Sequence, residues 1–443
     1  MTIQIPSKVN SIIHTLQQHG HEAYAVGGCV RDSLLGRIPN DWDITTSAKP
    51  EEVKALFHRT IDTGIQHGTV TVMIEKEGFE VTTYRIDGEY TDSRHPKEVI
   101  FTPDLQEDLR RRDFTINAMA YNEEQGLVDC FGGREDLEKR IIRCVGNAEE
   151  RFSEDALRIL RALRFAAQLG CTVEEDTMTA IRKLAPTLAN ISAERIQAEL
   201  LKMLVSPNPL MMRTVYETGI SAVIMPEWDA VMETEQNNPH HKYSVGEHTI
   251  HALEAVEPQK VYRLAMLFHD FGKPLVKTTD EQGIDHFYGH GDVSAELAET
   301  IMRRLKFDND TMDTVCKLVR YHDYRPSATK KGVRKGMAKT GQNIFPMLLP
   351  VMRADTLAQS DHMKEEKLDY INKLEELYEQ VLADGECVSL KMLAITGRDL
   401  LDNGFAQGKQ IGTVLNQLLE IVLEEPEKNN REYLLEKAKE YLS

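Results

Sequence analysis

Hydrophobic and polar positions follow two different rhythms over the first 146 residues. Short apolar or β-branched runs predict strands, and the segments between them have the three-to-four-residue spacing of helices. The predicted strands are residues 23–26, 42–46, 69–74, 79–85, 127–129 and 141–145. Strands interspersed with helices predict a first domain, residues 1–146, with a mixed sheet and helices.

From residue 149 onward the apolar positions recur at i, i+3 and i+4, which predicts helices. A break at 237–241 opens a stretch dense in histidine, with eight of the fifteen histidines between residues 240 and 322. After residue 363 the pattern is again helical and highly charged. The fold class predicted is multidomain α+β, with the sheet domain followed by all-α segments 147–238, 239–362 and 363–443.

Composition narrows the function classes. The chain has 443 residues, a formal net charge of −18 and six scattered cysteines without a Cys-x-x-Cys pair. Reduced cysteines and the lack of a long apolar run or signal pattern predict a cytoplasmic protein without a membrane segment. The negative charge argues against indiscriminate nucleic-acid binding and against an RNA chaperone. Local basic tracks remain at 110–112, 158–164 and 330–339, the last of which is more often plain surface.

Two carboxylates one residue apart, Asp41 and Asp43, lead into the β-branched run 44–46. On a strand they would share a face, with Cα atoms roughly 6.5–7 Å apart. That separation suits two hard cations about 3.5–4 Å apart, the arrangement used for in-line phosphoryl transfer. A solvated loop is the plainer interpretation, because Asp-x-Asp is common by chance.

Gly27-Gly28 follows the apolar run 23–26 and precedes a helical segment that contains Arg31. A strand, two glycines and a helix bring backbone N–H groups close to a phosphate, to which Arg31 would add a bidentate contact. A tight turn with a surface arginine is the alternative. No Walker sequence occurs in the chain. Together, the glycines and the carboxylate pair predict nucleotidyl transfer.

Three further segments of the first half carry candidate chemistry. Glu80 lies inside a β-branched strand, where a carboxylate is either at an exposed edge or engaged by a metal. The polar loop 88–96 would close over a nucleotide or form an exposed hairpin. The segment 110–120 is predicted to start a helix with Asp113 and Asn117 on one face, which would hold phosphate and ribose or form surface ion pairs.

Residues 154–165 predict an amphipathic helix with Ser153 as its N-cap. In the plain interpretation Glu154 pairs with Arg158 four residues later. In the functional one, Asp155 and Arg158 present acceptors and donors to the edge of a base. Arg158 and Arg161 are close enough to cooperate, whereas Arg164 would face nearly opposite Asp155.

In this order, the motifs resemble class II tRNA nucleotidyltransferases, the family of bacterial CCA-adding enzymes and poly(A) polymerases within the polymerase-β-like superfamily. The resemblance covers roughly residues 20–205. The matching stretches are Gly27-Gly28 with Arg31-Asp32, Asp41-Trp42-Asp43, Glu80 in Glu-Val-Thr-Thr-Tyr-Arg, the run 111–118, and Glu154-Asp155-x-x-Arg158.

The resemblance implies a head, neck, body and tail, with catalytic Asp41, Asp43 and Glu80 and with Mg²⁺ on the two aspartates. It implies that nucleotide is held by Gly27, Gly28, Arg31, Arg111, Asp113, Asn117, Asp155, Arg158, Arg161 and Arg164. Asp155 and Arg158 would read CTP and then ATP, and tRNA would be the partner. Asp92-Ser93-Arg94-His95-Pro96 resembles the flexible loop of CCA- and A-adding members, with His95 where a second arginine is frequent.

Residues 239–362 resemble an HD-type metal phosphohydrolase domain. The resemblance implies four ligands, His248, His269, Asp270 and Asp355, for a transition metal such as Ni²⁺ or Mn²⁺. His290 and His322 stand where some members have ligands for a second metal. The sequence leaves open whether this domain hydrolyses phosphate esters or only packs beside the tail.

The function expected from these patterns is template-independent addition of CCA to tRNA 3′ ends by two-metal nucleotidyl transfer. The alternatives are an A-adding enzyme, a poly(A) polymerase, or an HD phosphohydrolase that acts on RNA 3′ ends. The oligomeric state does not follow from the sequence.

Overall fold

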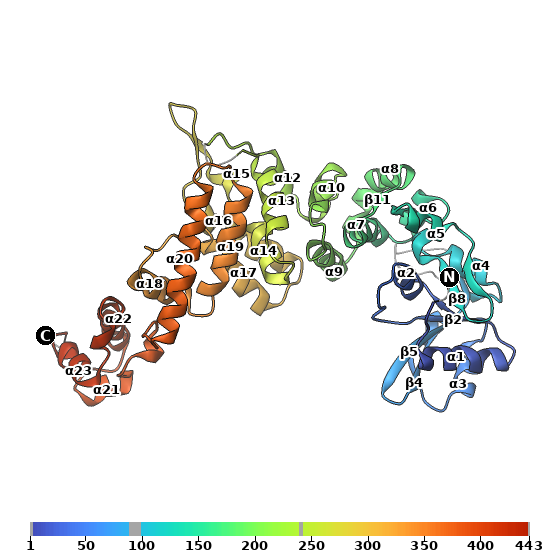
Figure 1. Cartoon of the computed structure of the whole chain (residues 1–443), viewed down its shortest axis with the longest axis horizontal. Helices are drawn as coiled ribbons and strands as arrows, with labels where there is room; N and C mark the ends of the chain where they lie inside the picture. The colour runs from blue at the N-terminus through green and yellow to red at the C-terminus, as the bar shows by residue number, and fades with distance from the viewer. Residues whose placement is uncertain (1–2, 88–98, 239–241, 442–443) are drawn as a thin grey trace. The chain divides into compact units, whose positions relative to one another are not determined.

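The computed structural model describes residues 3–87, 99–238 and 242–441. Its contacts divide the chain into two compact units, Met1–Pro226 and Glu227–Ser443 (Figure 1). The predicted segments 1–146 and 147–238 fall mainly in the first unit, and its boundary lies twelve residues before the predicted break at 238. The finer division into four domains stays a prediction.

A seven-stranded mixed sheet forms the base of the first unit, in the order β3-β4-β5-β2-β1-β8-β9 (Figure 1). Among the described strands of this sheet, β2 and β5 are the one parallel pair, with Ile44 opposite Val81 and Thr46 opposite Thr83. The strands are β1 (Ala23–Val26), β2 (Ile44–Thr46), β3 (Thr60–Gly64), β4 (Thr69–Ile74), β5 (Glu77–Thr83), β8 (Met119–Asn122) and β9 (Gly126–Asp129). The mixed sheet confirms the predicted fold class of this domain.

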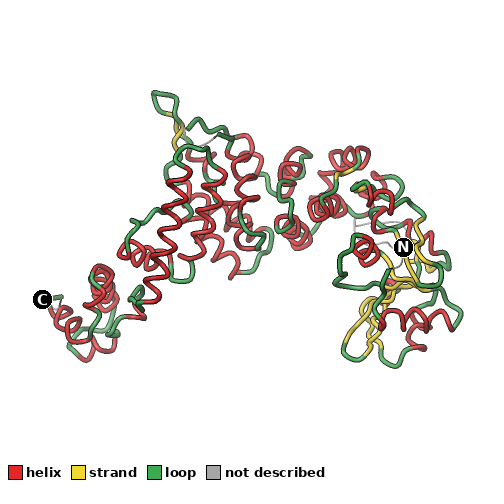
Figure 2. Tube along the Cα trace, viewed as in Figure 1, coloured by secondary structure: helices red, strands yellow, loops and turns green. Residues whose placement is uncertain are grey.

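Helices cover the sheet and then continue beyond it. Those associated with the sheet are α1 (Ser7–Gln18), α2 (Gly28–Leu34), α3 (Pro50–Leu56), α4 (Leu105–Arg110) and α5 (Gly133–Glu138). The next are α6 (Ala148–Glu154), α7 (Leu157–Leu169), α8 (Glu175–Leu184), α9 (Ala193–Leu204), α10 (Met211–Glu217) and α11 (Ser221–Ile224). Figure 2 shows the strands of the chain gathered mainly near its N-terminal end.

The prediction of a helix starting at residue 110 is wrong. After α4 the chain forms a short 3₁₀ turn, Thr115–Asn117, and then enters strand β8. The segment is held extended against residues 143–145, since the Thr115 N–H donates to the Arg143 carbonyl and the Val145 N–H to the Asp113 carbonyl. Long-range backbone pairing has overridden the local helical spacing.

The helix predicted over 154–165 is interrupted at Asp155. Ser153 belongs to α6, where its hydroxyl donates to the Glu149 carbonyl, and is not the N-cap of the following helix. Asp155 is extended (φ −141°, ψ 102°), and α7 begins only at Leu157. The side chain of Asp155 accepts the Leu157 N–H at 3.0 Å, so the aspartate caps α7 from outside it.

In its described residues, the second unit is helical apart from a two-stranded hairpin, β12 (Thr278–Thr279) with β13 (Asp285–His286). Its helices are α12 (Glu227–Glu233), α13 (Val245–Ala255), α14 (Lys260–Phe268), α15 (Lys273–Val276), α16 (His290–Arg304), α17 (Asn309–Tyr321), α18 (Lys330–Thr340), α19 (Phe345–Ala358), α20 (Lys364–Ala383), α21 (Gly397–Asp402), α22 (Lys409–Glu424) and α23 (Arg431–Lys439). Helix α13 packs on α19, and α17 packs on α14 and α16. None of the described helices has the length and apolar character needed to cross a membrane.

Candidate functional site

Asp41, Asp43 and Glu80 line one cavity of about 850 Å³ in the first unit. The two aspartates stand just before β2 rather than within it, because the strand begins at Ile44. The parallel pairing of Ile44 with Val81 places Asp43, just before β2, beside Glu80, which lies within β5. The structure therefore brings together the three carboxylates that the sequence singled out.

Negative charge is concentrated in this cavity, where three carboxylates lie close together. Burial raises the pKa of Asp43 and the charge of Asp41 raises it further, whereas the Arg112 guanidinium lowers it. Burial and the charges of Asp43 and Asp41 also raise the pKa of Glu80. Three oxygen-donor groups that repel one another fit a hard divalent cation such as Mg²⁺.

Gly27 lets a guanidinium approach the turn between β1 and α2. It has φ +80°, and a Cβ placed there would lie 2.9 Å from Nη1 of Arg112. The Gly27 N–H donates to the Met119 carbonyl at 3.1 Å. A side chain at this position would therefore both strain the backbone and displace Arg112.

Asp108 is a fully buried acid that the sequence did not single out. Its carboxylate accepts from the Thr45 hydroxyl at 3.1 Å and from Arg111 at 2.8 Å, and lies 3.7 Å from Arg112. Asp108 thus ties the strand next to Asp43 to both arginines. Its spacing of three and four residues before them was the available sequence signal.

A chain of hydrogen bonds joins α2 to α7. Arg31 Nη1 donates to Asn117 Oδ1 at 2.7 Å, and Asn117 Nδ2 donates to Asp113 Oδ1 at 3.1 Å. Arg161 donates twice to Asp113 Oδ2, at 2.9 and 2.6 Å. Although burial opposes it, Arg161 and these hydrogen bonds lower the pKa of Asp113 to about 2. Asp113 and Asn117 meet as predicted, across a turn and not along a helix.

The predicted template pair is engaged with other side chains. Arg195 of α9 donates to Asp155 Oδ2 at 2.8 Å. Arg158 donates to Glu154 at 2.6 Å and to the Arg111 carbonyl at 3.1 Å. Sequence reasoning anticipated the Glu154 pair but missed Arg195, which is 40 residues from Asp155.

Arg164 has partners of its own on α7 and α9; that it faces nearly opposite Asp155 stays a prediction. It is buried and forms an ion pair with Glu199 of α9, and it donates to Gln168 at 2.9 Å. Helix α9 therefore contributes Arg195 and Glu199, one turn apart, as partners for both ends of the Asp155–Arg164 segment.

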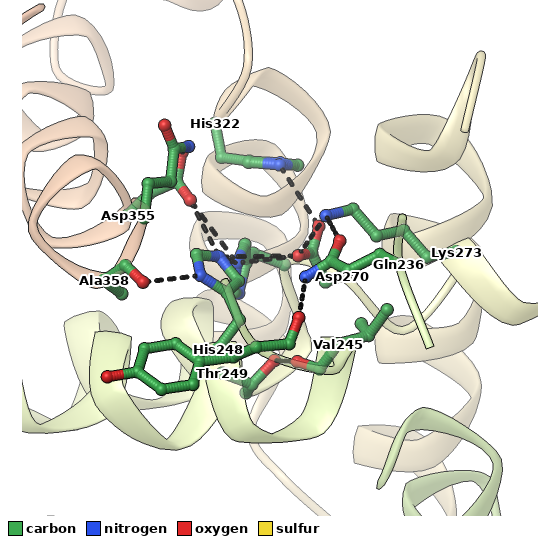
Figure 3. A network of polar contacts seen from close by, with 12 residues as sticks. Gln236, Val245, His248, Thr249, Asp270, Lys273, His322, Asp355 and Ala358 are labelled. Atoms are coloured by element: carbon green, nitrogen blue, oxygen red, sulfur yellow. Dashed lines mark hydrogen bonds and ion pairs between the residues drawn. The ribbon is translucent and has the colours of Figure 1, made fainter. Parts of the chain in front are cut away.

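In the second unit the four predicted HD ligands meet in the interior, and Figure 3 shows three of them, His248, Asp270 and Asp355. His248 lies on α13, His269 and Asp270 directly follow α14, and Asp355 lies on α19. All four are buried. His248 Nε2 is 3.0 Å from Asp355 Oδ1 and 3.2 Å from His269 Nε2, which in turn is 3.2 Å from Asp270 Oδ2.

His290 and His322 join the cluster on the other side of Asp270. Their Nε2 atoms are 3.1 Å apart and lie 3.4 and 3.8 Å from Asp270 Oδ1. Asp270 thus points one oxygen toward each pair of histidines. Lys273 lies 2.7 Å from Oδ2 of the same carboxylate.

The histidine tautomers decide what this cluster fits. In all four histidines Nδ1 faces a backbone carbonyl, at 3.3 Å for His248, 2.7 Å for His269, 2.8 Å for His290 and 2.7 Å for His322. A carbonyl only accepts, so each Nδ1 carries a proton and Nε2 is the nitrogen that each ring turns into the cluster. Two facing Nε2 atoms beside a carboxylate fit a bound cation, and the arrangement occurs twice.

The basic segment 330–335 is neutralised within the second unit. Each of its four cations forms an ion pair with an acid of the C-terminal helices or of the segment just before them. The pairs are Lys330 with Asp384, Lys331 and Lys335 with Glu424, and Arg334 with Glu386. This stretch is therefore a structural contact and not an open basic track. The loop candidate 92–96 lies outside the described residues.

Known proteins resemble the chain along most of its length. The family model described as "Poly A polymerase head domain" matches residues 23–143, and "Probable RNA and SrmB-binding site of polymerase A" matches 170–232. A tRNA nucleotidyltransferase domain 2 model matches 277–438, across much of the segment predicted to be HD-type.

Among curated relatives, the CCA-adding enzyme of Leuconostoc mesenteroides is 46% identical over 239 residues, 53% of this chain and 60% of that protein. The CCA-adding enzyme of Oceanobacillus iheyensis is 55% identical over 196 residues, 44% of this chain and 49% of that protein. The chain thus spans about half the length of the curated relatives it matches.

A solved structure extends the similarity. The Bacillus stearothermophilus CCA-adding enzyme in complex with CTP aligns with a TM-score of 0.70 and 30% identity, covering 97% of this chain and 95% of that one. The Thermotoga maritima CCA-adding enzyme complexed with tRNA shares the fold, with a TM-score of 0.58 at 21% identity.

A mixed-sheet head with a carboxylate cavity, followed by an arginine-bearing helix, defines the class of polymerase-type nucleotidyltransferases. Within that class, the chain belongs to the CCA-adding enzyme family of tRNA nucleotidyltransferases.

Proposed function

We propose that this protein adds CTP and then ATP to the 3′ end of tRNA without a nucleic-acid template. The observation that carries the proposal is the cavity lined by Asp41, Asp43 and Glu80, in a chain whose relatives are named CCA-adding enzymes. The six unpaired cysteines favour the cytoplasm as its location.

In the proposed reaction the 3′-hydroxyl oxygen of the RNA attacks the α-phosphorus of the nucleotide. A bond forms between that oxygen and phosphorus, the bond to the bridging oxygen breaks, and pyrophosphate leaves with the electron pair. The hydroxyl proton passes to solvent. Mg²⁺ held by Asp41 and Asp43, with Glu80 beside them, would supply charge neutralisation for this step.

Arginines of α2 and α7 have the remaining roles in this proposal. Arg31 is held by Asn117 and Asp32, and Arg161 by Asp113, so both guanidinium groups have fixed positions from which an incoming phosphate would take over some of these hydrogen bonds. Asp155 and Arg158 would read the base edge. Since both already have protein partners, the incoming base replaces contacts to Arg195 and Glu154. A base that offers the wrong donors leaves buried groups unpaired, which is the basis of selection.

The test uses tRNA transcripts ending before the first C, after C and after CC, with labelled CTP or ATP supplied separately. We expect CTP addition on the first two and ATP addition on the third. ATP addition on the CC end alone indicates an A-adding enzyme, and long A tails indicate a poly(A) polymerase. Asp41→Ala should abolish addition and retain tRNA binding in a gel shift, whereas Asp62→Ala, an exposed acid paired with Lys54, should leave addition unchanged.

We propose a second function, metal-dependent hydrolysis of phosphate esters, for the histidine cluster. It is favoured by the inward-facing Nε2 atoms of two histidine pairs around Asp270, with Ni²⁺ or Mn²⁺ as fitting ions. The test measures metal content and Mn²⁺-dependent release of phosphate from RNA 3′ ends. His269→Ala should lose both and keep nucleotide addition. His251→Ala, on the same helix as His248 but outside the cluster, is the control.

A further inference from the structure

The ring of Phe165 contacts guanidinium groups from two helices of the first unit, α2 and α7. Phe165 lies on α7 and is only 5% exposed. The guanidinium carbons of Arg31, Arg161 and Arg164 lie 5.0, 5.4 and 3.8 Å from its centroid. Each is within the range in which an aromatic ring attracts a cation, and the attraction is stronger when the pair is desolvated. Three such contacts on one ring are an unusual concentration.

The same ring is also held by the segment that carries Asp113 and Asn117. Phe114 packs edge-on against Phe165, with centroids 5.8 Å apart and planes at 79°. Phe165 therefore joins three pieces of chain that are far apart in sequence: α2, residues 113–117 and α7.

Each of the three cations keeps an acidic partner while it contacts the ring. Arg31 pairs with Asp32 at 2.9 Å, Arg161 with Asp113 at 2.6 Å, and Arg164 with Glu199. The carboxylates offset the repulsion among the guanidinium groups, which lets them gather around one ring. The ring fixes their separation, and the acids fix their orientation.

We propose that Phe165 is a positioning residue that couples base selection to phosphate placement. Arg31 lies in the proposed phosphate cradle, and Arg161 lies one turn from Arg158 on the base-reading helix. A closed circuit runs from Arg31 through Asn117 and Asp113 to Arg161 and returns through the ring. A shift of α7 on binding the wrong base therefore also displaces Arg31.

This inference rests on the proposed nucleotidyl transfer, and the experiment below distinguishes a failure of the inference from a failure of the proposed function. Phe165 is replaced by phenylalanine analogues with one, two and three ring fluorines, which weaken the attraction for cations while nearly preserving shape. We expect kcat/KM for CTP to fall stepwise, by about tenfold for the trifluoro ring. UTP incorporation should fall less, so that discrimination between CTP and UTP narrows. Phe152, a fully buried ring of α6, receives the same analogues as a control and should show no trend.

Phe165→Leu provides the genetically simple counterpart, with melting temperature measured beside kinetics. Unchanged kcat/KM and discrimination across the fluorine series overturn the inference, as does a loss of melting temperature with unchanged kinetics, which marks a merely structural ring. CTP affinity is measured by calorimetry on every variant. A wild-type chain that binds CTP but extends no tRNA contradicts the proposed function alone, and the affinity trend with fluorination then decides the role of Phe165.

Discussion

Replacing Asp113 by asparagine tests the circuit between α2 and α7 through its dependence on pH. Asp113 is 8% exposed, and its pKa falls from an ordinary 3.8 to about 2 because Arg161 and Asn117 favour the ionised form. A lowered pKa means that the carboxylate stabilises the fold above pH 3.8 and that this stability is lost as pH falls toward 2. At 1.36 kcal/mol per pH unit, the contribution at pH 7 is about 2 kcal/mol.

We therefore expect the free energy of unfolding of the wild type to exceed that of Asp113→Asn by about 2 kcal/mol at pH 7. This difference should fall to roughly half by pH 3. Because the chain has two units that can unfold separately, the measurement needs a probe that reports unfolding of the first unit alone. The chain has two tryptophans, Trp42 in the first unit and Trp228 in the second. Urea unfolding followed by Trp42 fluorescence in a Trp228→Phe background supplies that probe. A difference that stays constant from pH 7 to pH 3 refutes the assigned ion pair.

Three further predictions concern other contacts. Gly27→Ala should destabilise the first unit by about 2–3 kcal/mol, measured by the same Trp42 fluorescence. Gly20→Ala is the control, because Gly20 has φ +85° but a Cβ there would have no atom within 4 Å, and it should cost only about 1 kcal/mol. Equal costs for the two variants would argue against the Arg112 contact. Arg195→Ala should raise UTP and GTP misincorporation about tenfold by freeing Asp155, and unchanged fidelity contradicts this role. His322→Ala should lower bound Mn²⁺ from two ions per chain to one, as measured by elemental analysis; retention of two ions excludes the second position.

Local pattern predicted best the short strands made of apolar or β-branched residues. The bounds 23–26 and 69–74 are reproduced to the residue. It failed where distant backbone took over, as at Asp113, whose carbonyl accepts the Val145 N–H. The spacing of Asp113 and Asn117 was informative, but it indicated a shared turn and not a helix.

The sequence predicted the candidate metal-binding carboxylates of the site. It did not predict the residues that position the site through hydrogen bonds and ion pairs. Asp41 and Asp43 were recognisable from their one-residue spacing, and Glu80 from its place in a β-branched strand. Asp108 and Arg195 were not, because their partners Thr45 and Asp155 lie 63 and 40 residues away. No local pattern marks an acid or base as a partner for a residue that only the fold brings near.

The shared Asp270 has a consequence for the durability of the second unit. The histidines around it come from α13, α16 and the ends of α14 and α17, so an ion bound there ties together helices that are separate in sequence. An ion that binds only the folded chain adds about 1.4 kcal/mol to its stability for each tenfold rise in free ion above the dissociation constant. The melting temperature of this unit would then rise with the concentration of free metal ion, and chelators would destabilise the protein.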